Sequence, residues 1–193
     1  MNLSDALWVQ FAFEAPVIAT LIIALPRLTQ LSYRELGFSL PKLSSLTTVA
    51  FGAIAMILVT DLSASLITKL AHTTHKQDVV ELLKHAHNPA TITGFIIFAV
   101  LLAPIAEETV FRLFLFNIGL RYGGFWIGAV ASALLFGAAH GDIYFLIPLA
   151  LAGFILATVY YRTRNAFCSM MVHATFNATT VIALYSSGSL HLH

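Results

Sequence analysis

The chain has 193 residues, of which 59% are hydrophobic and only 10% are charged, and its formal net charge is +1. Soluble domains carry about a quarter charged residues, so this composition excludes an ordinary soluble protein. The small net charge gives no reason to expect a nucleic-acid partner, and the single cysteine, Cys168, excludes a disulfide framework. The length suits a single membrane domain covering residues 1–193.

Six apolar segments follow one another along the chain, most of them close to the ~20 residues that a bilayer core requires. They are Leu7–Leu25, Leu46–Leu70, Thr91–Leu120, Phe125–His140, Ile143–Tyr161 and Ala166–Tyr185. No sustained alternation of apolar and polar residues is present, so these segments are predicted to be helices. The predicted fold class is an all-α bundle of about six transmembrane helices. Pro104 predicts a bend or break in the long third segment.

Turn signals separate the segments: Pro26, Pro41, Asn88–Pro89, Gly123–Gly124, Gly141–Asp142 and Arg164–Asn165. The long polar connection, Ala71–Ala90, contains four histidines: His72, His75, His85 and His87. These could bind a metal, but a solvated loop is the favoured interpretation. Residues 1–90 are therefore expected to form two peripheral helices and a polar loop, and residues 91–185 the functional core.

Lysine and arginine predict the orientation in the membrane, because cytoplasmic loops carry an excess of both. Six of them fall in loops that would share one side: Arg27, Arg34, Lys42, Arg121, Arg162 and Arg164. The other side would hold Lys69, Lys76, Lys84, Asp5, Asp78, Glu81 and Asp142. The first side is predicted to be cytoplasmic.

The third segment contains "EETVFR", which places two carboxylates and an arginine among apolar residues. Glu108 and Arg112 are four residues apart, so on a helix they share a face and can form an ion pair. Glu107 points about 100° away from Glu108 and has no local partner. A structural ion pair with Glu107 near an interface is the simplest interpretation of this motif alone.

Two further motifs favour a functional site over a purely structural ion pair. The fourth segment ends in "FGAAH", with His140, and the sixth contains "HATFN", with His173 and Asn177 four residues apart. Ionisable groups at membrane depth are expected to face the bundle interior and to find one another. We therefore predict a cluster of Glu107, Glu108, His140, His173 and Asn177. Glu14 and Asp61 are further acids in apolar segments, which leaves a proton-coupled carrier as an alternative, although the two halves show no matching broken helices.

In this order, "EETVFR", "FGAAH" and "HATFN" resemble the three motifs of the CPBP intramembrane protease family, which includes type II CAAX prenyl endopeptidases and bacteriocin-processing proteins. The resemblance maps the family's polar positions onto Glu107, Glu108, Arg112, His140, His173 and Asn177. Leu113 stands where the family often has glycine. The implied activity is that of an intramembrane endopeptidase acting on a peptide or membrane-protein substrate that is prenylated or not. A non-catalytic scaffold or immunity protein is the alternative from another class.

The residue types suit hydrolysis. Glu107 beside His140 could hold and deprotonate a water, and His173 with Asn177 could stabilise the oxyanion. Glu108, held by Arg112, would fix the helix. The resemblance implies the same roles. A zinc-dependent version would use Glu107, His140 and His173, but no HExxH helix is present and metal-free catalysis is favoured, without a cofactor. The expected location is a prokaryotic cell membrane, with the site open to the cytoplasm.

Residue counting along the helices places His140 and His173 at different depths in the membrane, which conflicts with a shared site. His173 lies nine residues beyond Arg164, or about 13 Å along a helix, whereas His140 lies about 33 Å back from Arg162 if the fifth helix runs straight. The two histidines could share a site only if the fifth helix begins near Pro148. We therefore predict a half-depth connection at Gly141–Ile147 and a water-filled cavity.

Overall fold

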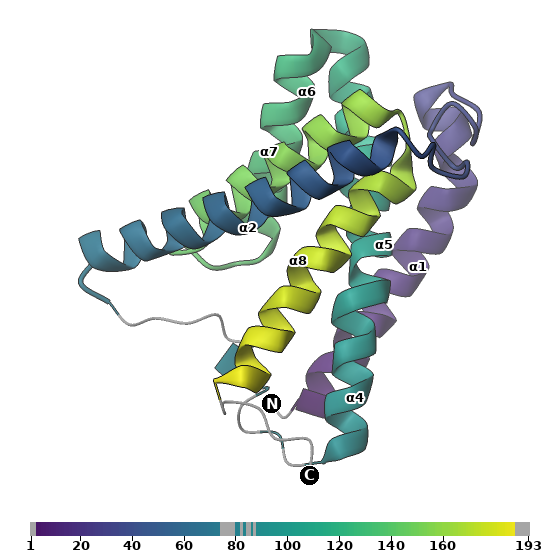
Figure 1. Cartoon of the computed structure of the whole chain (residues 1–193). Helices are drawn as coiled ribbons and strands as arrows, with labels where there is room; N and C mark the ends of the chain where they lie inside the picture. The colour runs from purple at the N-terminus through teal and green to yellow at the C-terminus, as the bar shows by residue number, and fades with distance from the viewer. Residues whose placement is uncertain (1–2, 74–79, 82, 84–85, 87, 188–193) are drawn as a thin grey trace.

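The computed structural model describes residues 3–73, 80–81, 83, 86 and 88–187, and every regular element in these ranges is helical (Figure 1). The elements, with η marking π-helices, are α1 (Leu3–Thr29), α2 (Ser45–Leu70), α4 (Pro89–Ile97), η1 (Phe98–Leu102), α5 (Ala103–Glu108), η2 (Thr109–Phe116), α6 (Asn117–Ala139), α7 (Leu146–Thr163) and α8 (Ala166–Ser186). The predicted all-α membrane bundle is confirmed.

Four helical stretches in the described residues are long and apolar enough to cross a membrane: Ser45–Leu70, Pro89–Ala139, Leu146–Thr163 and Ala166–Ser186. Two predicted segments share the 51-residue stretch Pro89–Ala139, because the chain folds back on itself within α6. Gly124 makes this turn with φ of 73°, a conformation that glycine adopts without strain. The first predicted segment lies in the 27-residue α1, which is not among these four stretches.

The turn predicted at Pro26 is wrong, because α1 continues through this residue to Thr29. A proline has no N–H, so inside a helix it leaves the carbonyl four residues earlier without its donor. That carbonyl belongs to Ile22, and the Tyr33 hydroxyl donates to it at 2.5 Å. The loop after α1 thus supplies the missing hydrogen bond and lets the helix run on.

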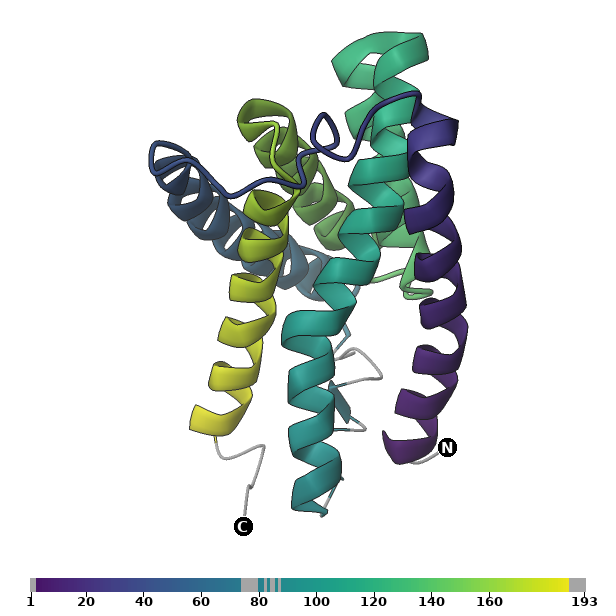
Figure 2. The ribbon, with the colours of Figure 1, turned by 90° about the vertical axis from the view of Figure 1, so that its right-hand side faces the viewer.

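The loops that carry the predicted cytoplasmic arginines meet at one end of the bundle. In Figures 1 and 2 the connection from α1 to α2 crosses this end beside the turn between α7 and α8. Gly37 accepts a hydrogen bond from the Ala166 N–H at 3.1 Å. Asn165 accepts from Cys168 N–H as the cap of α8 and donates to the Ser39 carbonyl at 2.7 Å. The basic loops therefore share one side, as predicted from the distribution of lysine and arginine.

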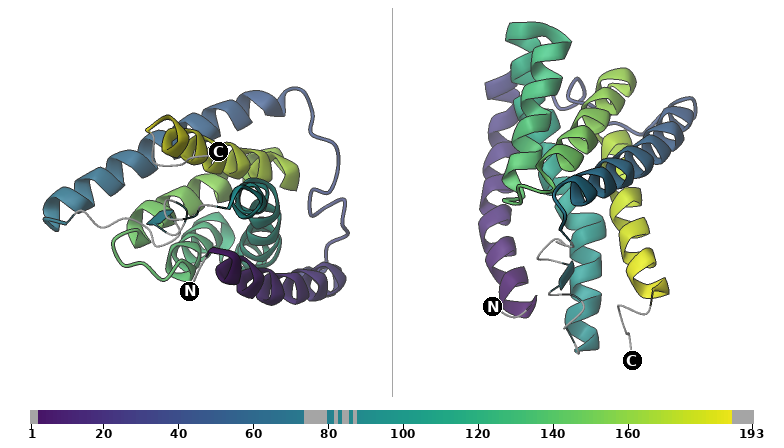
Figure 3. Two further views of the ribbon diagram at one scale, coloured as in Figure 1. Left: turned by 90° about the horizontal axis from the view of Figure 1, so that it is seen from below. Right: turned by 90° about the vertical axis from the view of Figure 1, so that its left-hand side faces the viewer.

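The connection between α6 and α7 turns midway along the bundle, whereas α1, α4 and α8 extend well beyond it (Figures 2 and 3). Residues 140–145 make this turn, with Gly141 at φ of 69°, and α7 begins at Leu146. No continuous helix starts at Gly141. The half-depth connection predicted from residue counting is present, with α7 beginning two residues earlier than Pro148.

Close backbone contact holds the two arms of α6 together and gives a first testable prediction. A Cβ at Gly128 would lie 2.7 Å from Leu120 N and 2.9 Å from Phe116 O, whereas a Cβ at Gly94 would meet nothing within 4 Å. Gly128→Ala should lower stability by about 1–3 kcal/mol. Gly94→Ala is the matched control and should raise it by about 0.5–1 kcal/mol. Thermal unfolding in detergent would measure both, and equal effects would contradict the close packing.

Candidate active site

The two adjacent glutamates lie on α5, a helix of six residues placed between the π-helices η1 and η2. Glu108 and Arg112 are both fully buried, and Arg112 Nε lies 3.1 Å from Glu108 Oε2. The predicted ion pair is confirmed. The two atoms are at contact distance without the alignment of a hydrogen bond, so the attraction between them is mainly electrostatic.

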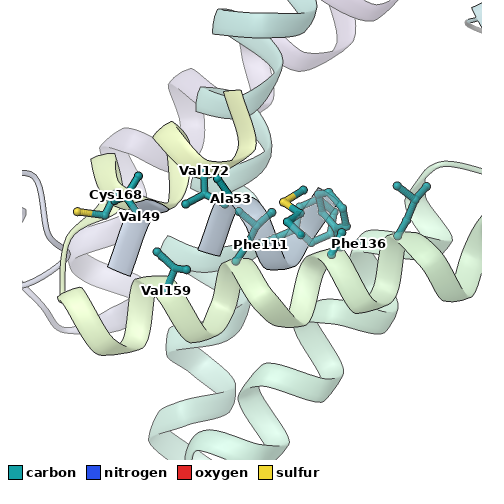
Figure 4. Close-up of a cluster of buried hydrophobic side chains, with 11 residues drawn as sticks. Val49, Ala53, Phe111, Phe136, Val159, Cys168 and Val172 are labelled. Carbon is teal, nitrogen blue, oxygen red and sulfur yellow. The ribbon is translucent and has the colours of Figure 1, made fainter. Parts of the chain in front are cut away.

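Arg112 is enclosed by protein on the side away from Glu108. Its guanidinium donates to the Gly153 carbonyl on α7 at 3.3 Å and lies over the Phe136 ring, 4.7 Å from the centroid. Phe136 packs edge-on against Phe111 within the hydrophobic cluster of Figure 4. A charge so fully enclosed requires compensation, and Glu108 provides it.

His173 on α8 lies between the two carboxylates. Its Nδ1 is 3.1 Å from Glu108 Oε1, and its Nε2 is 3.8 Å from Glu107 Oε2. An ionised carboxylate only accepts hydrogen bonds, so Nδ1 carries the proton that is donated to Glu108. The 3.8 Å separation is too long for a direct hydrogen bond, but one water can bridge such a distance.

Glu107 differs from Glu108 in its surroundings. Its side chain is 20% exposed, and its Oε2 atom is buried without a hydrogen-bond partner among the described residues. In the hydrocarbon region a buried polar atom is costly unless a polar group or a water satisfies it. The partly exposed carboxylate is therefore the member of the pair that is available to a water.

Ser169 is a further polar residue of this cluster that sequence reasoning missed. It is fully buried on α8, next to the Glu108 carboxylate, which its hydroxyl can reach; in the described rotamer the hydroxyl donates to the Ala166 carbonyl at 3.1 Å. Ser169, His173 and Asn177 are spaced at four-residue intervals, so they form one stripe along α8. That spacing was the signal in the sequence that could have revealed Ser169.

His140 lies at the start of the half-depth connection and is exposed. Its Nδ1 donates to the Phe136 carbonyl at 2.8 Å, so in the neutral ring Nε2 is the nitrogen that can accept a hydrogen bond. The His140 and His173 rings both contact Phe136, with centroids 5.0 and 5.7 Å from that ring. The two histidines therefore pack against the same aromatic side chain. No direct contact joins His140 to Glu107 among the interactions of the described residues, so their shared water stays a prediction.

Asn177 lies one turn beyond His173, and its amide points to the backbone of η1. Its Nδ2 donates to the Ala99 carbonyl at 2.7 Å. Among the described interactions it contacts neither glutamate, so its predicted role at the oxyanion stays untested.

A zinc site would need three ligands close together. No group of three histidine, cysteine, aspartate or glutamate side chains in the described part of the chain is arranged to hold a metal ion. Glu107, His140 and His173 therefore do not form a zinc ligand set in this conformation. Of the loop histidines, His75, His85 and His87 lie outside the described residues. Asp61 is exposed on α2, and the side chain of Glu14 is outside the described part.

Comparison with known proteins finds a family match over the part of the chain that contains this polar cluster. Residues 89–179 match the family described as "Type II CAAX prenyl endopeptidase Rce1-like". This stretch is called the Rce1-like domain below, after the family that it resembles. The Rce1-like domain contains all six predicted site residues, from Glu107 on α5 to Asn177 on α8, and Ser169. The family resemblance predicted from the three motifs is confirmed.

Three relatives each match a little under half of the chain. A candidate membrane peptidase of Bacillus subtilis, YdiL, is 30% identical over 87 residues, 45% of this chain and 36% of its own length. An uncharacterised 24.3 kDa protein of Escherichia coli is 36% identical over 90 residues, which are 44% of this chain and 41% of its own length. The membrane-embedded CAAX protease MroQ of Staphylococcus aureus is 31% identical over 94 residues, which are 46% of this chain and 38% of its own length.

The matches to these relatives span less than half of their lengths. No solved structure gives a significant match. The apolar helices and the similarity to a membrane peptidase support an integral membrane protein.

Proposed function

We propose that the Rce1-like domain is an intramembrane endopeptidase in which Glu107 activates the attacking water. The observation that carries this proposal is the separation of 3.8 Å between Glu107 Oε2 and His173 Nε2, next to a carboxylate oxygen that has no other partner in the described residues. A water in this position would donate to Glu107 and lie within reach of His173. Removal of its proton by Glu107 generates the nucleophile for attack on a peptide carbonyl.

The other polar residues support this reaction in different ways. Glu108 and Arg112 orient His173 through its Nδ1 and do not touch the water. Asn177 uses one amide N–H for Ala99, and we assign the second to the oxyanion that forms during attack. His140 offers a free Nε2 from the half-depth connection and would hold the water or the leaving amine.

The proposed substrate is a peptide or a membrane protein, and the family description makes a prenylated C-terminal segment the first one to test. The positions of the basic loops favour a site that opens toward the cytoplasm of a prokaryotic cell.

Purified protein in liposomes provides the test. The probes are a quenched fluorescent peptide that ends in a farnesylated CAAX sequence and the same peptide without the lipid. Each is assayed with and without a zinc chelator. Cleavage that persists in the chelator supports the glutamate mechanism, and loss that zinc restores would support the metal-dependent alternative. Absence of cleavage of both probes by folded protein would contradict the proposed peptidase activity on this substrate class.

His140 provides a separate prediction. His140→Ala should lower turnover by about 10²–10⁴-fold, the usual contribution of a positioned acid or base. Because His140 is exposed, the melting temperature should change little. His72, an exposed histidine just beyond α2, is the matched control, and His72→Ala should leave turnover unchanged. Turnover of His140→Ala close to that of the wild type would remove His140 from the mechanism.

A further inference from the structure

The glutamates of α5 begin three residues after a proline, and the backbone just before that proline is π-helical. Pro104 occupies the first turn of α5, directly after η1. In a π-helix each N–H bonds to the carbonyl five residues earlier. The Ala103 N–H follows this pattern and bonds to Phe98 O.

The next bond of the same ladder cannot form. It would join residue 104 to Ala99, but proline has no N–H. The Ala99 carbonyl instead accepts the Asn177 amide from α8 at 2.7 Å. A side chain on another helix therefore occupies the position of the absent backbone donor.

This substitution matters because the bond lies within a membrane helix. Water in the hydrocarbon region cannot satisfy a freed carbonyl, so neighbouring side chains must do so. We propose that Asn177 is a positioning residue that replaces the N–H missing from Pro104 and thereby fixes the direction in which α5 presents Glu107. This role is additional to the proposed contact of Asn177 with the oxyanion, and its effect on catalysis rests on the proposed peptidase function.

A double-mutant cycle on Asn177 and Pro104 tests the inference. Asn177→Ala leaves the Ala99 carbonyl without a donor and should lower the melting temperature by roughly 2–8 °C. In the Pro104→Ala background the backbone N–H at residue 104 returns and can bond to the Ala99 carbonyl. Asn177→Ala should therefore lower the melting temperature by less than half as much in that background. The loss of turnover caused by Asn177→Ala should also be about ten-fold smaller in that background. The part that remains is the contribution of the oxyanion contact.

α1 provides a matched control with the same chemistry away from the site. There the Tyr33 hydroxyl replaces the N–H missing from Pro26 by donating to Ile22. Tyr33→Phe should lower the melting temperature, and Pro26→Ala should relieve that effect, whereas turnover per folded molecule stays unchanged in both. The control distinguishes a side chain that only donates the hydrogen bond a proline cannot donate from one that also positions a catalytic group.

The outcomes are distinct. Equal effects of Asn177→Ala on the melting temperature in both backgrounds would overturn the inference, as would equal losses of turnover. If Asn177→Ala alone does not fold, recovery of folding in the double variant supports the inference, and failure to recover opposes it. The double-mutant cycle on melting temperature needs no substrate. If the wild type cleaves neither probe, the peptidase proposal fails, but the cycle still decides whether Asn177 replaces the N–H that Pro104 lacks.

Discussion

Replacement of Glu107 by glutamine is expected to abolish peptide cleavage while the protein remains folded. Glutamine keeps the size of the side chain but cannot take a proton from water, so turnover should fall by about 10²–10⁴-fold or more. Among the described residues no arginine forms an ion pair with Glu107, whose side chain is 20% exposed. Arg112 also interacts electrostatically with Glu107, but it keeps Glu108 as its direct partner when Glu107 is replaced. Cleavage of the quenched peptides and thermal unfolding, measured on the same preparation, would check both expectations.

The matched comparison is Glu35→Gln. Glu35 is an exposed acid in the connection between α1 and α2, where it accepts hydrogen bonds from the Ser32 hydroxyl and N–H. These bonds lower the pKa of Glu35, so it is ionised at neutral pH, and its replacement also removes one negative charge. Turnover should be unchanged. If Glu107→Gln cleaved as fast as Glu35→Gln, the general base would have to be another residue.

The parts of the site that follow from local spacing could be predicted from the sequence. The ion pair of Glu108 and Arg112 needs only residues four apart on one helix. The half-depth connection followed from counting helical rise against the need for His140 and His173 to lie at similar depth. Both depend on helix geometry that changes little with tertiary context, and the structure contains both.

The π-helices and the side chains that satisfy them could not be predicted in the same way. A π-turn adds one residue to a helical turn, and no pattern of apolar residues marks where this happens. Asn117 donates to the carbonyls of Arg112 and Leu113, each at 3.1 Å, and Ser132 donates to Phe111 at 2.6 Å. The Asn117 bonds are local to the π-turn, whereas the bond from Ser132 joins residues 21 apart and therefore depends on packing.

The position of His173 is a consequence of that packing. From spacing alone His140 was predicted beside Glu107, and His173 was assigned with Asn177 to the oxyanion. In the structure it is His173 that lies between both carboxylates. The spacing of Ser169, His173 and Asn177 predicts that they share one face of α8. The rotation of α8 about its axis relative to α5 determines which of them contacts the glutamates.

Replacement of Glu108 by glutamine should have a different outcome from replacement of Glu107, because Glu108 compensates a buried charge. Arg112 is fully buried, and its Nη1 atom has no hydrogen-bond partner among the described residues. Removal of one member of a buried ion pair typically costs about 3–5 kcal/mol. Glu108→Gln should therefore lower stability strongly and also lower turnover, because a weaker, neutral amide oxygen replaces the charged acceptor of the His173 Nδ1 proton.

A second substitution separates these two effects. Glu108→Gln combined with Arg112→Met removes both charges and fills the space with an apolar side chain, which is often neutral for stability. The double variant should unfold at a temperature close to that of the wild type but keep the lowered turnover of Glu108→Gln, because the charged acceptor that orients His173 is still absent. Thermal unfolding and cleavage of the quenched peptides would be measured on all three variants. If Glu107→Gln proved more destabilising than Glu108→Gln, the structural and catalytic roles of the two glutamates would have to be exchanged.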